Sequence, residues 1–147
     1  MNSAAIRNAM TVDVEDYFQV SAFAPHISRE SWTSISCRVE LNIDRILALL
    51  DNDGTKATFF TLGWIADRYP AMVKRIVANG HELASHGWAH HRVSDQEPNE
   101  FRDDVIRSKK IVEDMGGHAV LGYRAPSFSI GRHNLWAWDG REEARER

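Results

Sequence analysis

Apolar residues along the chain recur at two spacings, which predict alternating strands and helices. Residues 10–14 (MTVDV) form a short β-prone run, and residues 56–60 (KATFF) form another that is rich in β-branched and aromatic side chains. Between these runs, apolar side chains recur at helical spacing from Val39 to Leu50, and the sequence DNDG at 51–54 is typical of a helix end. This part of the chain therefore predicts strand, helix, strand.

The alternation continues through the rest of the chain. Pro70 suits the first turn of a helix, and Gly80 is well placed as its left-handed cap. Residues 82–85 form a short segment before a histidine-rich stretch, a third helix is expected over 101–115, and a fourth strand is expected over 120–123. Strands that alternate with helices predict an α/β fold with a mostly parallel sheet.

Composition narrows the class of protein. An apolar content of 43% with five tryptophans in 147 residues favours one packed globular domain. The formal net charge of −3, without a long basic cluster, argues against a nucleic-acid or anionic-membrane surface. Cys37 is the only cysteine, which excludes an internal disulfide and a multi-thiolate metal site. No apolar run approaches the roughly 18 residues of a membrane span, and we expect a soluble cytoplasmic protein.

Three polar segments follow predicted strands. They are residues 13–16 (DVED), residues 86–90 (HGWAH) and residues 124–126 (RAP). Because the carboxyl ends of parallel strands meet at one rim of a sheet, we expect these segments to come together there.

His86 and His90 lie four residues apart, so both imidazoles can reach one ion from a helical turn or a tight loop. The alternative is accidental spacing, because the chain has seven histidines. The acidic cluster on another strand end favours the metal site. Two histidines and one carboxylate leave positions open for water and substrate, as in a catalytic site for a divalent ion such as zinc.

The acidic cluster contains Asp13, Glu15 and Asp16. They could all be solvated loop acids, but Asp13 interrupts an apolar run where an unpaired carboxylate would be costly to bury. Arg124 is a suitable partner, because a guanidinium can hold a carboxylate bidentately. The alternative is that Arg124 is a surface residue before a turn stiffened by proline.

Four motifs resemble those of a known family in order and spacing. The chain resembles the polysaccharide deacetylases of the NodB-homology class, which are carbohydrate esterase 4-like, and within them the branch found beside exosortase and exopolysaccharide genes. The resemblance runs from about Met10 to Trp136. It rests on the segments TVDVEDYF (11–18), KATFFTLGW (56–64), GHELASHGWAH (80–90) and GYRAPSF (122–128).

This resemblance implies a distorted, TIM-like (β/α) barrel that removes N-acetyl groups from the amino sugars of a polysaccharide. It implies a divalent metal, with zinc the expected ion, held by one carboxylate, His86 and His90. Asp13 matches the catalytic base of the family and Arg124 the arginine that braces it. Val14 stands where the commonest family pattern has a second aspartate, so the carboxylate ligand is Glu15 or Asp16. Of these two we lean towards Asp16.

The resemblance also suggests where an acetylated polysaccharide or oligosaccharide would bind. We expect it to contact residues near the motifs, namely Tyr17, Trp88, Pro126 and Phe128. Tryptophan in a small domain is more often part of the core. We expect a core position for Trp64, and both interpretations of Trp88 stay open.

The family pattern stops after Trp136, although such a barrel needs roughly 200 residues or more. The motif that carries the family's catalytic acid is not found. We therefore divide the chain into a tail (1–9), an incomplete deacetylase-like domain (10–138) and a charged tail (139–147). An open sheet edge in a partial barrel favours self-association as a homo-oligomer. Two alternatives to an active deacetylase are a catalytically silent fragment that binds metal or sugar, and a metal-free allantoinase-like amidohydrolase.

Overall fold

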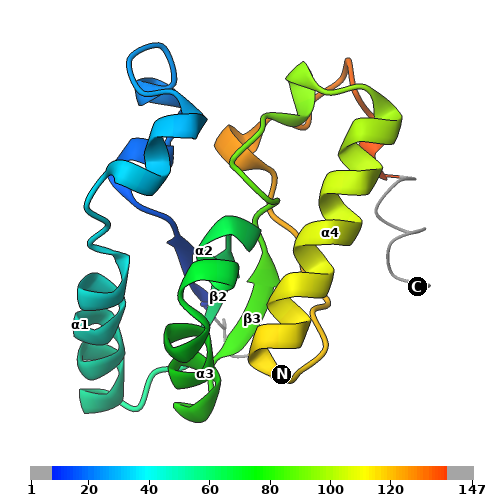
Figure 1. Ribbon diagram of the computed structural model, residues 1–147. Coiled ribbons are helices and arrows are strands. Elements are labelled where there is room, and N and C mark those ends of the chain that lie inside the picture. The colour runs from blue at the N-terminus through cyan, green and yellow to red at the C-terminus, as the bar shows by residue number, and fades with distance from the viewer. Residues whose placement is uncertain (1–7, 139–147) are drawn as a thin grey trace, which may run out of the picture.

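The computed structural model describes residues 8–138 and contains a parallel sheet with three strands in the order β1-β2-β3 (Figure 1). These strands are β1 (Met10–Val14), β2 (Ala57–Thr61) and β3 (Glu82–Ser85). The strands expected over 10–14 and 56–60 are confirmed, as is the parallel α/β class. The two expected tails, apart from residues 8 and 9, lie outside the described residues.

Four α-helices of residues 8–116 accompany the sheet, with α2 and α3 in front of it and α1 and α4 on either side in the view of Figure 1. They are α1 (Val39–Asn52), α2 (Gly63–Arg68), α3 (Pro70–Ala78) and α4 (Pro98–Gly116). The sequence pattern predicted three of these helices but missed the short α2. Short 3-10 helices connect these elements, namely η1 (Tyr17–Gln19), η2 (Ser21–Phe23), η3 (Arg29–Ser34), η4 (Val93–Asp95) and η5 (Pro126–Phe128).

The helix ends follow the local chemistry of the sequence. Pro70 occupies the first turn of α3, where the missing N–H of proline costs no hydrogen bond. Gly80 follows α3 with a φ of 76°, and its N–H donates to the Val77 carbonyl at 2.8 Å. Gly117 likewise ends α4 in the left-handed region, with a φ of 70°.

The main core lies between the sheet and its helices. Val14, Phe59 and Leu83 of the three strands are buried there against the apolar faces of α1 and α3, which include Ile43 and Met72. Side chains alternate along a strand, so Asp13 belongs to the opposite face of the sheet from Val14. The register pairs Asp13 with Phe60, which places both on that second face.

The strand expected over 120–123 does not form. Only Tyr123 makes a β-bridge, to Ser85 at the end of β3. The N–H of Val120 donates instead to the carboxylate of Glu113 on α4 at 2.8 Å, so this N–H is not available to a neighbouring strand. The isolated bridge still places Arg124 beside the end of β3, where its N–H donates to the Ser85 carbonyl at 2.9 Å.

Strand β1 pairs only with β2 among residues 8–138, so its other edge is open. The self-association expected from such an edge stays a prediction. No helix in the described part of the chain is both long enough and apolar enough to cross a membrane.

Candidate active site

Glu15, His86 and His90 come together at the carboxyl end of the sheet. The Oε2 atom of Glu15 lies 3.2 Å from Nε2 of His90 and 3.9 Å from Nε2 of His86. One ligand atom from each of the three residues lies within 4.8 Å of the others, so the group could hold one metal ion. The structure thus brings the two histidines together with an acid that follows the first strand.

The loop that carries the two histidines is held by the start of α2. The N–H groups of Gly63 and Trp64 donate to the carbonyls of Gly87 and Trp88 at 2.9 and 3.0 Å. His90 has a φ of 53°, which is uncommon for a residue with a side chain. These bonds fold residues 86–90 into a tight turn, so both imidazoles reach the same point.

Each imidazole has a partner at its Nδ1 atom. Nδ1 of His86 lies 2.8 Å from the Arg124 carbonyl oxygen, which can only accept, so His86 carries its proton at Nδ1. Nδ1 of His90 lies 3.4 Å from Oγ of Ser21. A histidine that binds a metal through Nε2 donates its Nδ1–H to a neighbour of this kind. The Nε2 lone pairs are thereby directed towards Glu15.

The electrostatics of the group suit a divalent cation. Burial, together with the charge of Asp13, raises the pKa of Glu15 to about 7. Burial lowers the pKa of His90 to about 4 and lowers that of His86 as well, so both rings are neutral at neutral pH. Oε2 of Glu15 is buried, and no donor among residues 8–138 meets it with hydrogen-bond geometry. Two neutral imidazoles and one carboxylate form a donor set that zinc accepts.

Asp16 is not part of this group, contrary to the preference drawn from the sequence. It is the N-cap of η1, and its carboxylate accepts the N–H of Tyr17 at 2.8 Å and the N–H of Arg38. Burial alone would raise its pKa, but these hydrogen bonds lower it. The geometry thus favours Glu15 as the carboxylate ligand. Both acids follow the last residue of β1, so strand alternation assigns neither of them to a face, and only the tertiary structure distinguishes them.

Asp13 and Arg124 form the predicted ion pair. Nη1 of Arg124 lies 2.5 Å from Oδ1 of Asp13, and Nη2 donates to Oγ1 of Thr11 at 3.0 Å. The guanidinium therefore spans two side chains of β1 and is not bidentate on Asp13. It also lies 4.0 Å from the centre of the Phe60 ring. The other carboxylate oxygen, Oδ2, lies 3.9 Å from Nε2 of His86 and faces the candidate metal site.

A cavity of about 220 Å³ joins these groups. Phe128 is 83% exposed at its wall, so one residue expected to contact substrate is beside the site. The wall also includes the ion pair and the three candidate ligands, namely Asp13, Arg124, Glu15, His86 and His90.

The other residues expected to contact substrate do not line this cavity. The ring of Tyr17 lies under the guanidinium of Arg38, 4.6 Å from it. Trp88 stacks with Arg107 of α4 at 3.4 Å, and Pro126 is buried. Trp88 thus has a packing role here. Trp64 is partly buried against the core, as expected.

Two serines of the site were missed by sequence reasoning. Oγ of Ser21 lies 2.8 Å from Oγ of Ser127 and 3.4 Å from Nδ1 of His90, and it accepts the Nε–H of Arg92 at 3.2 Å. Ser127 lines the cavity and has a φ of 53°. Isolated serines in loops carry no pattern in the sequence, so only the fold reveals this cluster.

Comparison with known proteins identifies the class. A family model described as "Polysaccharide deacetylase" matches residues 37–138, which is more than half of the chain. The chain therefore belongs to the polysaccharide deacetylase family. Strand β1 and its acids precede the matched residues, so their place in the site rests on the structure.

Two curated relatives show which activities are named in this family. A peptidoglycan-N-acetylglucosamine deacetylase of Bacillus cereus is 34% identical over 94 residues, which cover 63% of this chain and 34% of that protein. A chitooligosaccharide deacetylase of a Bradyrhizobium species is 30% identical over 95 residues, which cover 64% of this chain and 41% of that protein. The chain thus spans about a third to two fifths of these relatives.

Solved structures share the fold. The Bc1960 peptidoglycan N-acetylglucosamine deacetylase matches with a TM-score of 0.68 at 24% identity, over 92% of this chain and 52% of that one. A CE4 family pseudoenzyme from Bacillus anthracis matches with a TM-score of 0.70 at 18% identity, over 92% of this chain and 39% of that one. The expected fold class, the N-terminal part of a NodB-type barrel, is confirmed.

Proposed function

We propose that this protein is a metal-dependent deacetylase that removes N-acetyl groups from the amino sugars of a polysaccharide. One observation carries the proposal: a neutral pair of histidines and a buried carboxylate meet beside an aspartate that is paired with an arginine. The names of the relatives support a substrate of acetylated amino sugars. An exopolysaccharide is the polymer we propose, on the family resemblance of the motifs.

Glu15, His86 and His90 would hold the metal, and zinc is the ion that we propose. Such an ion supplies Lewis acidity towards an amide carbonyl and lowers the pKa of water. The protein contributes the orientation of the ligands. His86 is fixed by the Arg124 carbonyl, and burial keeps both imidazoles neutral and able to bind.

Asp13 is the general base of the proposed reaction. Arg124 occupies its Oδ1 atom and leaves Oδ2 on the side of the candidate metal site, where it can accept a proton from water. Arg124 itself is anchored by Thr11 and Phe60, so the carboxylate is held in one orientation. Phe128, exposed at the cavity wall, offers an apolar surface to a sugar ring.

A pair of adjacent acids tests the proposed ligand set. Glu15→Gln should weaken zinc binding by more than about 100-fold. Even the loss of a group that only hydrogen-bonds a metal ligand lowers metal affinity by about 10 to 100-fold. Asp16→Asn is the matched control. The Asp16→Asn variant should bind zinc with an affinity within about threefold of that of the unchanged protein. Its free energy of unfolding should fall by about 1 kcal/mol, because the N-cap of η1 is weakened. Competition with a zinc chelator measures the affinity. Equal zinc affinity in both variants would contradict the assignment of Glu15.

Acetate release from acetylated amino-sugar oligomers tests the reaction. We expect zinc-dependent release that Asp13→Asn lowers by about 100-fold to 10,000-fold, as is typical for loss of a general base, without loss of zinc binding. Zinc binding without any acetate release would support the catalytically silent alternative. Release that survives a strong chelator would support a metal-free amidohydrolase.

A further inference from the structure

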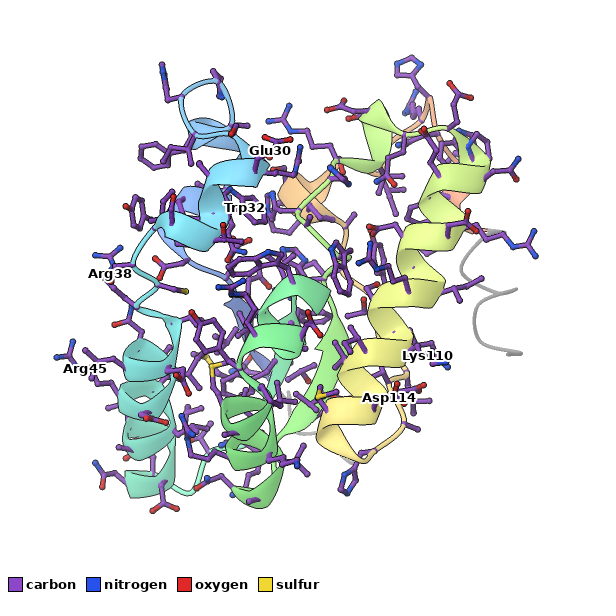
Figure 2. The ribbon with its side chains drawn as sticks, viewed as in Figure 1. Glu30, Trp32, Arg38, Arg45, Lys110 and Asp114 are labelled. Carbon is purple, nitrogen blue, oxygen red and sulfur yellow. The ribbon has the colours of Figure 1, made fainter. Side chains whose placement is uncertain are left out.

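A second cavity, of about 830 Å³, borders the candidate active site. The segment 18–32 forms one side of it, and residues 90–95 form the other. Figure 1 shows these two segments at the same end of the molecule, and Figure 2 labels Glu30 and Trp32 on the first. Val20 and His90 belong to the walls of both cavities. A ligand in the larger cavity would therefore lie next to a group bound in the smaller one.

Two arginines in this wall, Arg29 and Arg92, have no carboxylate within ion-pair distance among residues 8–138, although the charges of Glu30 and Asp104 act on Arg29 from further away. Nε of Arg29 donates to the Ala89 carbonyl at 2.9 Å, and Nε of Arg92 donates to Oγ of Ser21 at 3.2 Å. These two hydrogen bonds hold each arginine side chain through its Nε atom. No carboxylate of residues 8–138 lies within 4.0 Å of either guanidinium. Their terminal amino groups are therefore available for an anionic ligand.

The acids of the same wall are already engaged by local donors. Oδ1 of Asp95 accepts the hydroxyl of Ser94 at 2.9 Å. The pKa of Glu30 is lowered by hydrogen bonds from its own N–H and from the Ser28 hydroxyl, and further by the charge of Arg29. Neither acid forms an ion pair with the two arginines in the described part of the chain. The cavity thus holds two arginines without an ion pair within 4.0 Å in residues 8–138, and a guanidinium can hold a carboxylate by two hydrogen bonds.

We propose that this cavity binds a carboxylate-bearing sugar adjacent to the N-acetylated residue, so that the substrate is an anionic polysaccharide. The proposal rests on the function proposed above, because it places the neighbouring sugar relative to the candidate metal site. Arg29 and Arg92 are the residues that determine this specificity. The carboxylate could belong to a uronic acid or to an acidic substituent, since the two present the same chemistry.

Binding of two tetrasaccharides to the full chain, with zinc present, tests the proposal. One tetrasaccharide alternates glucuronate with N-acetylglucosamine, and the other is neutral tetra-N-acetylchitotetraose. We expect the anionic ligand to bind about tenfold more tightly at low salt, as charge-assisted hydrogen bonds would give. Salt should reduce this preference, because it screens exposed charges.

Variants that remove a positive charge test whether Arg29 and Arg92 cause the preference for the anionic tetrasaccharide. The double variant Arg29→Gln, Arg92→Gln should bring the two affinities within about twofold of each other. Arg45→Gln is the control. Arg45 is exposed on the outer side of α1 (Figure 2), so this substitution removes a positive charge at a place away from the cavity. A thermal melt of each variant verifies folding.

Three results would overturn the proposal. Acetate release from the neutral oligomer without any preference for the anionic ligand would overturn this subsite alone. A preference that persists in the double variant would place the anion elsewhere. If neither tetrasaccharide binds and no acetate is released, both this inference and the proposed function are overturned.

Discussion

At the scale of single residues, the orientation of His90 depends on a serine that the sequence gives no reason to select. Ser21 Oγ can accept from Arg92 and from Nδ1 of His90, and it can then donate its own proton to Ser127. This polarity leaves Nε2 of His90 deprotonated, which is the form that binds a metal. Ser21 is therefore a positioning residue.

Ser21→Ala should weaken zinc binding by about 10 to 100-fold, which is the range typical for loss of a group that hydrogen-bonds a metal ligand. Ser31→Ala is the matched control, because Ser31 belongs to the same segment but donates to the Ser28 carbonyl, away from the site. Chelator competition gives the zinc affinity, and the ¹⁵N shifts of His90 give its tautomer. An unchanged affinity and tautomer in Ser21→Ala would show that Ser21 has no such role.

At the scale of elements, α2 explains why the histidine loop is rigid. Its first residues bind the carbonyls of residues 87 and 88, and Gly63 lets the two segments approach closely. A Cβ atom on Gly63 would lie 2.6 Å from Cε3 of Trp88 and 3.1 Å from Cγ2 of Ile111. Helix propensity alone would favour alanine at this position, whereas packing forbids it.

Gly63→Ala should lower the free energy of unfolding by about 1–3 kcal/mol, as overpacking does in a dense core. It should also weaken zinc binding, because the loop that carries the histidines has to shift. Gly117→Ala serves as a comparison. Its φ is 70° with no atom within 4 Å of the added Cβ, so only about 1 kcal/mol of backbone cost is expected, with no effect on zinc. Urea unfolding measures both variants, and a gain of stability in Gly63→Ala would refute the packing argument.

At the scale of the whole molecule, a metal would link the end of β1 to the loop after β3. Such a ligand binds the folded chain and not the unfolded one, so it stabilises the fold by about 2.7 kcal/mol when its concentration is 100 times the dissociation constant. The proposed metal site is therefore also a prediction about stability.

This stabilisation should depend on pH. The pKa of Glu15 in the metal-free protein is raised to about 7, so this carboxyl binds a proton below pH 7 that zinc must displace. Zinc affinity should be constant above pH 7 and fall about tenfold for each pH unit below it. His90, whose pKa is about 4, adds no further loss until about that pH. Calorimetric titration in buffers of different ionisation enthalpy counts the protons released. Zinc binding without proton release at pH 6 would contradict this prediction.

Much of the architecture was predictable from local patterns. The helical spacing from Val39 to Leu50, Pro70 with Gly80, and the β-prone runs each predict the element that forms. The strand over 120–123 does not form, and the N–H of Val120 donates to Glu113 near the end of α4 instead of to a strand. Local propensity contains no information about such a competitor.

The sequence by itself determined most of the elements, the convergence of strand ends, and the pairing of Asp13 with Arg124, because these follow from periodicity and from the cost of burying a lone charge. The tertiary structure decided which acid faces the histidines, the packing of Trp88 on α4, and the contact of Ser21 with His90. These depend on where side chains remote in the sequence meet. That is set by the packing of whole elements, which no short stretch of sequence specifies.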